Sequence, residues 1–140
     1  MRLLRLTSKG VRVMMKELTT KQKVIIALSH LSVLMGIGII LPIIFYFVID
    51  DDRIKQNAKE AAGFQICIII VDAILGVLLA IGWALSFILV GIPIVIIVGI
   101  VAFAINVAAV VFAIIATIKS LDVGIYYYPV TSKIVNGLIN

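Results

Sequence analysis

The sequence predicts an all-α, polytopic membrane protein: a bundle of three transmembrane helices with short interfacial helices. Two observations predict this class. The 140 residues are 64% hydrophobic and 14% charged, with a mean hydropathy of +1.29, whereas a soluble domain is about half apolar and a quarter charged. Long stretches of the chain also lack charge. A single domain in lipid is therefore expected, and a water-soluble fold is excluded as the starting assumption.

Residues 1–23 form a basic N-terminal tail that holds seven of the 12 Lys and Arg residues. Five of the seven follow helical spacing, which suits binding to anionic lipid. A tail that only helps to set orientation is the alternative. With three spans, the N-terminal side carries seven basic residues and the other side five, which favours a cytoplasmic N-terminus. A start at Met14 or Met15 would remove that margin.

Residues 24–140 form the transmembrane domain. No charge occurs from 24 to 49, and Asp72 is the only charge from 61 to 118. Because about 20 helical residues cross a hydrocarbon core of about 30 Å, the first run supplies one span and the second supplies two. Gly91 and Pro93 mark a turn within the second run. The expected spans are 24–49, 64–90 and 93–118, and a fourth, short span after Trp83 is the alternative.

Polar segments connect and follow these spans. One of the aspartates at 50–52 is expected to cap a short interfacial helix over 53–62. After the third span, three consecutive tyrosines precede Pro129, and apolar residues then recur every four positions. This pattern predicts a C-terminal interfacial segment over 126–140.

Four polar residues are expected inside the membrane. An ionisable side chain in a span should face protein or water because its burial in lipid is costly. Asp72 lies about 12 Å from one face of the bilayer and Asn106 about 20 Å from the other, so we predict that they meet. Asp72 either handles protons or ions, or fixes helix register through Asn106. Gln65 shares the helix face of Asp72. His30 lies near the opposite bilayer face, where hydrogen-bonded packing is favoured over metal binding.

Small residues form a seam along the third span and recur once on the second. Such residues let helix backbones approach closely in membranes. The expected helix-packing positions are Gly76, Gly99, Ala102, Ala109, Ala113 and Ala116.

Nothing in the sequence predicts an enzyme. One His and dispersed acids cannot supply a nucleophile, a base and an orienting group. We expect no catalytic residue, no metal site, no cofactor and no nucleic-acid partner. The expected partners are the lipid bilayer, including anionic lipid at the basic tail, and further copies of this chain or other membrane proteins.

Four short motifs occur in a fixed order: Ser29-His30-Leu31-Ser32, Lys59-Glu60-Ala61, Phe64-Gln65 and Tyr128-Pro129. In this order, and over about residues 24–135, the chain resembles the Tic-twenty-like family of small prokaryotic membrane proteins. Gly63 stands where that family usually has Asn. The resemblance marks His30, Phe64, Gln65, Tyr128 and Pro129 as important positions but implies no established activity. A distant plastid relative of the family is a subunit of a protein-import translocon.

Two functions are therefore considered for a multi-pass protein of a prokaryotic cell membrane. The first is a non-enzymatic subunit or scaffold that acts through helix association, and the small-residue seam motivates it. The second is a pore or transport component, distantly similar to a protein-import translocon subunit. The polar residues Asp72, Gln65 and Asn106 motivate that alternative.

Overall fold

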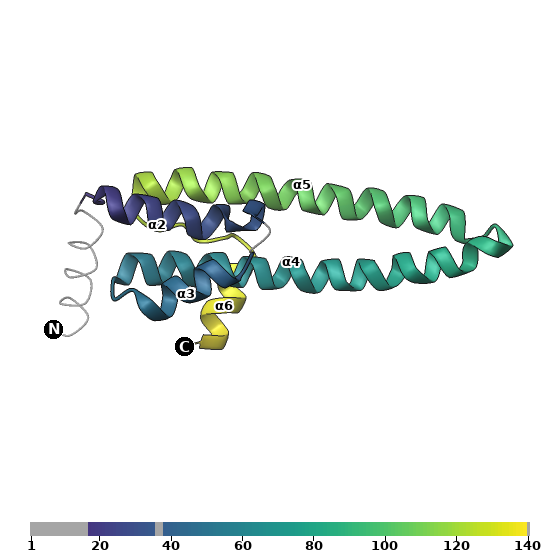
Figure 1. The fold of residues 1–140 in the computed structure, drawn as a ribbon, viewed down its shortest axis with the longest axis horizontal. Coiled ribbons are helices and arrows are strands. Elements are labelled where there is room, and N and C mark those ends of the chain that lie inside the picture. Colours follow the sequence, from purple (N-terminus) through teal and green to yellow (C-terminus); the bar gives the residue numbers. More distant parts are fainter. Residues whose placement is uncertain (1–16, 36–37, 140) are drawn as a thin grey trace.

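A computed structural model describes residues 17–35 and 38–139 of the chain (Figure 1). All regular elements within these ranges are helical, which confirms the all-α class. The expectations about the basic face of residues 2–16 lie outside the described residues. The elements are α2 (Thr20–Leu31), the 3-10 helix η1 (Ser32–Met35), α3 (Ile40–Val48), α4 (Asp52–Leu85), the 3-10 helix η2 (Ser86–Ile88), α5 (Gly91–Val123) and α6 (Thr131–Ile139).

The molecule consists of a head and a distal hairpin. The long helices α4 and α5 run antiparallel, and α2, α3 and α6 pack against one end of this pair (Figure 1). We call that end the head, and residues 71–107 of α4 and α5 the distal hairpin. Within the distal hairpin only Gly82 and Gly91 are buried. The packed core of the described chain therefore lies in the head.

Within the described ranges, two helices are long and apolar enough to cross a bilayer, judged by length and composition: Asp52–Ile88 and Gly91–Val123. The prediction of a single span over 24–49 is wrong. This run folds as the antiparallel pair α2 and α3, whose 12 and 9 residues make about 18 and 14 Å of helix, short of a bilayer core of about 30 Å. Gly38 adopts a positive φ of 49° in the connection, and Pro42 stands in the first turn of α3, where its missing N–H costs nothing.

The separate interfacial helix expected over 53–62 is not found, because these residues are the first turns of α4. The expected aspartate cap is present, and it is Asp51. Asp51 Oδ1 accepts hydrogen bonds from the backbone N–H groups of Arg53 (3.0 Å) and Ile54 (3.1 Å). Its other carboxylate oxygen accepts from Gln22 Nε2 at 2.6 Å. Asp51 thus begins α4 and also ties it to the first turn of α2.

The turn predicted near Gly91 and Pro93 is confirmed. Leu89 adopts a left-handed φ of 63°, and α5 begins at Gly91. A Cβ at Gly91 would collide with the carbonyl oxygen of Gly82 and the backbone nitrogen of Ser86. The two long helices can therefore come this close only because position 91 lacks a side chain.

We expect Gly91→Ala to destabilise the hairpin by about 1–3 kcal/mol, because the added methyl group meets backbone atoms that cannot rotate away. Thermal unfolding of the detergent-solubilised protein, followed by circular dichroism, measures the effect. Gly99→Ala is the matched control, since a Cβ there meets nothing within 4 Å. Equal melting temperatures for the two variants would contradict this account of the turn.

Candidate functional site

The distal hairpin contains one polar pair. Asn106 Nδ2 donates a hydrogen bond to Asp72 Oδ1 at 3.0 Å, and also to the carbonyl oxygen of Ala102 at 3.0 Å. The predicted contact between Asp72 and Asn106 is therefore present. It joins α4 to α5 in a region where Trp83 and Ser86 are the only other side chains with a nitrogen or oxygen atom between Ile66 and Ala116.

Gln65 belongs to the head rather than to this pair. Its amide nitrogen donates to Ser32 Oγ at 2.9 Å and approaches the carbonyl oxygen of Ser29 at 3.5 Å. The side chain is buried. Gln65 therefore fixes the end of α2 against α4, and its position on the face of Asp72 does not bring the two side chains together.

A second polar cluster lies in the centre of the head, and we call it the head polar cluster: His30, Asn57, Glu60, Ser120 and Tyr128. All five side chains are buried. They come from α2, α4, α5 and the segment between α5 and α6. The cluster therefore joins four parts of the chain that are far apart in sequence.

The hydrogen bonds around His30 define its tautomer. Asn57 Nδ2 donates to the carbonyl oxygens of Arg53 (2.9 Å) and Gly124 (2.8 Å), so its Oδ1 must face His30 as an acceptor. His30 Nε2 lies 3.1 Å from that oxygen and carries the proton. His30 Nδ1 then accepts from the Tyr128 hydroxyl at 3.1 Å.

The neutral state of His30 follows from this environment. Burial lowers the pKa of His30 to about 4, and the hydrogen bond to Asn57 opposes this only in part. Burial also raises the pKa of Tyr128, with smaller contributions from Tyr126 and Glu60. The Tyr128 hydroxyl therefore keeps its proton and remains the donor to His30 Nδ1.

Glu60 holds the C-terminal part of the chain against α4. Its Oε2 accepts from the backbone N–H of Tyr128 at 3.3 Å. Its Oε1 accepts from Ser132 Oγ and Asn136 Nδ2, both at 2.9 Å, and from Gln56 Nε2 at 3.2 Å. A carboxylate that is buried without a cation is costly unless several donors satisfy it. Glu60 has four such donors.

Aromatic packing completes the cluster. The rings of Phe64 and Tyr128 stack with centroids 4.2 Å apart and an interplanar angle of 8°. His30, Phe64, Gln65 and Tyr128, which the short motifs single out, therefore lie together in the head. Pro129 is exposed and lies in the turn that leads into α6.

Sequence reasoning missed Asn57, Glu60 and Ser120 as members of this cluster. A signal was available on α4, because Asn57, Glu60 and Phe64 recur at spacings of three and four and so share one helix face. That face was assigned to a separate interfacial helix. Ser120 follows Ala116 at a spacing of four on the same helix face, but its contact with His30 Nε2 at 3.1 Å depends on the tertiary fold.

The helix-packing candidates fall into two groups. Ala109, Ala113 and Ala116 are buried in the head, and Ala102 is half-buried. A Cβ at Gly76 or Gly99 would meet nothing within 4 Å. The seam is therefore filled by this chain in the head and left open along the distal hairpin.

The chemistry of the head polar cluster is that of a structural site. His30 and Glu60 use their ring nitrogens and carboxylate oxygens within the chain, so neither group offers a free position to a substrate. Among the residues that the structure describes, no three His, Cys, Asp or Glu side chains gather in a way that could hold a metal ion. The cluster positions the C-terminal segment on the long helices.

In the comparison with protein families, residues 21–135 match the magnetosome magnetite crystal formation protein family, MamF/MmsF. The resemblance to the Tic-twenty-like family is therefore wrong, since the matched family is a different one. The short motifs behind that resemblance mark residues that pack in the head, and such packing does not by itself identify a family. No curated protein and no solved structure matches the chain.

We expect the head to lose stability as the pH falls from about 6.5 towards 4. The unfolded chain binds a proton at His30 with a pKa near 6.5, whereas the folded chain binds it only near pH 4. The free energy of unfolding should therefore fall by about 3 kcal/mol across this window, with the contribution fully present above pH 6.5.

Thermal unfolding of the wild type and of His30→Gln between pH 7.5 and 4.5 measures this dependence. The chain contains one His, so the difference between the two profiles isolates its contribution. Parallel profiles between pH 6.5 and 5 would show that His30 is not buried as a neutral ring.

Proposed function

Because the chain belongs to the magnetosome magnetite crystal formation protein family, we propose that it supports magnetite crystal formation as a non-enzymatic scaffold of the magnetosome membrane. In this proposal the distal hairpin crosses the bilayer and associates with neighbouring helices, while the head remains at one surface. The single observation that carries the proposal is the exposure of apolar side chains along the distal hairpin.

The distal hairpin exposes more apolar surface than a water-soluble monomer does. Phe87 is 94% exposed, Phe103 73% and Ile100 64%, and each lies on a helix that meets the bilayer criterion by length and composition. Monomeric soluble proteins rarely expose contiguous apolar patches larger than a few hundred Å². Lipid or other apolar helices are therefore the natural surroundings of residues 71–107.

The position of Trp83 suggests how the hairpin lies in the bilayer. Tryptophan is enriched at membrane interfaces, and the 20 residues that precede Trp83 on α4 cover about 30 Å, the thickness of the hydrocarbon core. The core then extends from Gly63 to Trp83, the head lies at the near interface, and the turn at Leu89 lies at the far one. Asp72 falls near mid-bilayer, where Asn106 donates a hydrogen bond to one of its carboxyl oxygens.

A topology with two spans also indicates on which side of the membrane the head lies. The first and last described helices, α2 and α6, both belong to the head, and no Lys or Arg occurs between residues 60 and 118. All 12 basic residues are then on one side, and a start at Met15 would still leave every remaining one there. The positive-inside rule therefore favours a cytoplasmic head.

Helix association is the proposed mode of action. Gly76 and Gly99 leave open space on the surface of the distal hairpin, and small residues of this kind allow close contact between membrane helices. The 3.0 Å bond between Asn106 and Asp72 supports a register-fixing role for Asp72. For these reasons we favour a scaffold over a pore.

Reporter fusions should place both termini on the cytoplasmic side and the turn near Leu89 on the other side. Alkaline phosphatase is active only outside the cytoplasm, so a fusion after residue 89 should be active and a C-terminal fusion inactive. Green fluorescent protein at the same two sites should give the reverse pattern. Termini on opposite sides would restore an odd number of spans and contradict the proposed topology.

Filling the open positions should block association without unfolding the monomer. We expect the double variant Gly76→Leu and Gly99→Leu to lose self-association or co-purification in mild detergent, and to fail to restore crystal size in a magnetite-forming bacterium that lacks the gene. Gly137→Leu is the matched control, because a Cβ at that position on α6 also meets nothing within 4 Å. Normal crystals from the double variant, measured by electron microscopy, would count against the scaffold.

A further inference from the structure

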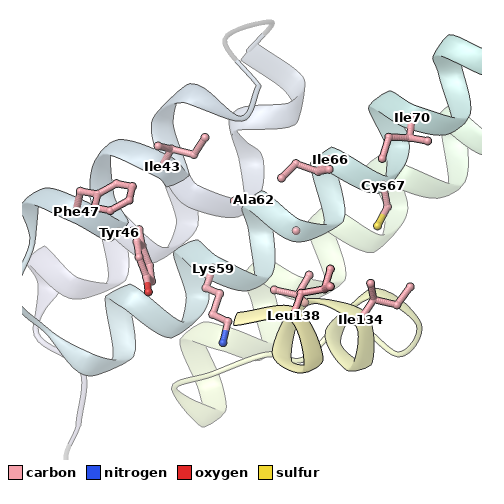
Figure 2. A pocket seen from close by; sticks show the side chains of 12 residues that line it. Ile43, Tyr46, Phe47, Lys59, Ala62, Ile66, Cys67, Ile70, Ile134 and Leu138 are labelled. Carbon is pink, nitrogen blue, oxygen red and sulfur yellow. The ribbon is translucent and has the colours of Figure 1, made fainter. Parts of the chain in front are cut away.

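A groove lies on the side of the head, between α3, α4 and α6 (Figure 2). Its volume is about 370 Å³, within the range of about 300–1,000 Å³ that is usual for ligand sites. Gly63 allows the groove to form, since a Cβ there would collide with Val135. α6 therefore lies directly against α4 and closes one side of the groove.

The lining is almost entirely apolar. Ile43 and Phe47 of α3, Ile66 and Ile70 of α4, and Leu138 of α6 face the groove (Figure 2). Among the described residues that line it, Lys59 is the only charged one. A hydrocarbon chain matches the walls, and an anion matches the one charge.

Charge and hydrocarbon are arranged in order along the groove. Lys59, Ile66 and Ile70 lie on one face of α4, and about 16 Å of helix separates the first from the last. With the hydrocarbon core beginning near Gly63, Lys59 lies about 6 Å outside it, at the level of lipid phosphates. Ile66 and Ile70 lie inside the core. The α4 wall of the groove thus has the same polarity as a lipid of the near leaflet, and the aromatic rings of Tyr46 and Phe47 on α3 lie beyond Lys59 (Figure 2).

Lys59 is also free to take a ligand. In the part of the chain that the structure describes, the one ion pair joins Lys55 to Asp50, and Lys59 makes none. Glu60, its neighbour in sequence, is buried and directs both oxygens to the C-terminal segment. Among the described side chains, no carboxylate therefore pairs with the ammonium group of Lys59.

We infer that this groove binds one anionic phospholipid, with an acyl chain along α4 between α3 and α6 and the phosphate on Lys59. The inference rests on the proposed membrane location of the head. A bound lipid would cover the apolar walls that α3 and α6 leave open. The occupancy of the groove would then depend on the fraction of anionic lipid in the membrane.

Native mass spectrometry of the full-length protein tests this site. The protein is titrated in detergent with phosphatidylglycerol and phosphatidylcholine that have identical acyl chains. We expect one retained lipid per chain and about fivefold preference for phosphatidylglycerol, the effect of one basic side chain near anionic lipid. Lys59→Gln should abolish the preference. Lys119→Gln is the matched control, because Lys119 is exposed on α5 at about the same depth but does not line the groove, and it should keep the preference.

A second measurement, photolabelling, starts from the wild-type protein. Phosphatidylglycerol with a photoreactive group on its acyl chain should label wild-type peptides from α3, α4 between residues 62 and 70, and α6. Cys67→Trp, which fills the groove, should remove this label. Equal lipid preference in the two lysine variants, or label confined to the distal hairpin, would overturn the inference. Cross-links between copies through the groove in place of lipid would overturn it too.

Flotation with vesicles separates this inference from the proposed function. A protein that does not float with phosphatidylglycerol and phosphatidylcholine vesicles contradicts both proposals. A protein that floats but retains no lipid selectively contradicts only the groove, because the distal hairpin alone suffices for membrane binding.

Discussion

The architecture depends on complete hydrogen bonding inside the head polar cluster. His30, Asn57 and Glu60 are buried polar groups whose loss from water is costly, and their full set of partners forms only when α2, α4, α5 and the C-terminal segment are all in place. Removing α2 would leave the Tyr128 hydroxyl without its partner, and removing the C-terminal segment would take three of the four donors from Glu60. This mutual dependence makes the head one cooperative unit although its helices are short.

The distal hairpin, in contrast to the head, has few internal contacts. It has almost no buried side chains, and within the chain it is held by a glycine turn, by Asp72 and Asn106, and by the contact of two helices. Its remaining apolar surface needs lipid or another protein. One part of the molecule is thus stabilised from within and the other from outside, and this division gives each part a separate role in the proposed scaffold.

Local chemistry in the sequence was sufficient for several features. Gly91 and Pro93 predicted the turn, an aspartate predicted the start of α4, and depth arithmetic predicted the contact between Asp72 and Asn106. The prediction of one span over 24–49 is wrong because mean hydropathy indicates whether a segment lies in an apolar environment, but it does not show where the chain turns back on itself. Gly38 and Pro42 are the same kind of turn signal as Gly91 and Pro93. They lie within an uncharged run whose 26 residues match the length of one span.

The candidate sites were harder to predict because they depend on distant contacts. Glu60 and Tyr128 are 68 residues apart in sequence and meet only after α5 has returned and the chain has reversed at Gly124. The groove likewise requires α6 to lie on Gly63, a contact that no local pattern indicates. Helical spacing marks which face of α4 is buried, but it does not say which segment covers that face.

The turn between the long helices has a consequence for biogenesis. Between Asp72 and Lys119 the chain carries no formal charge, and the backbone groups of α4 and α5 are satisfied within their own helices. During insertion from the side of the head, no ionised group has to pass through the hydrocarbon layer, and the carboxyl of Asp72 travels only halfway. In the proposed topology the two helices can therefore enter as a preformed pair, and the energetic barrier comes from the Asp72 and Asn106 pair, from Ser86 and from the few open backbone groups of the turn.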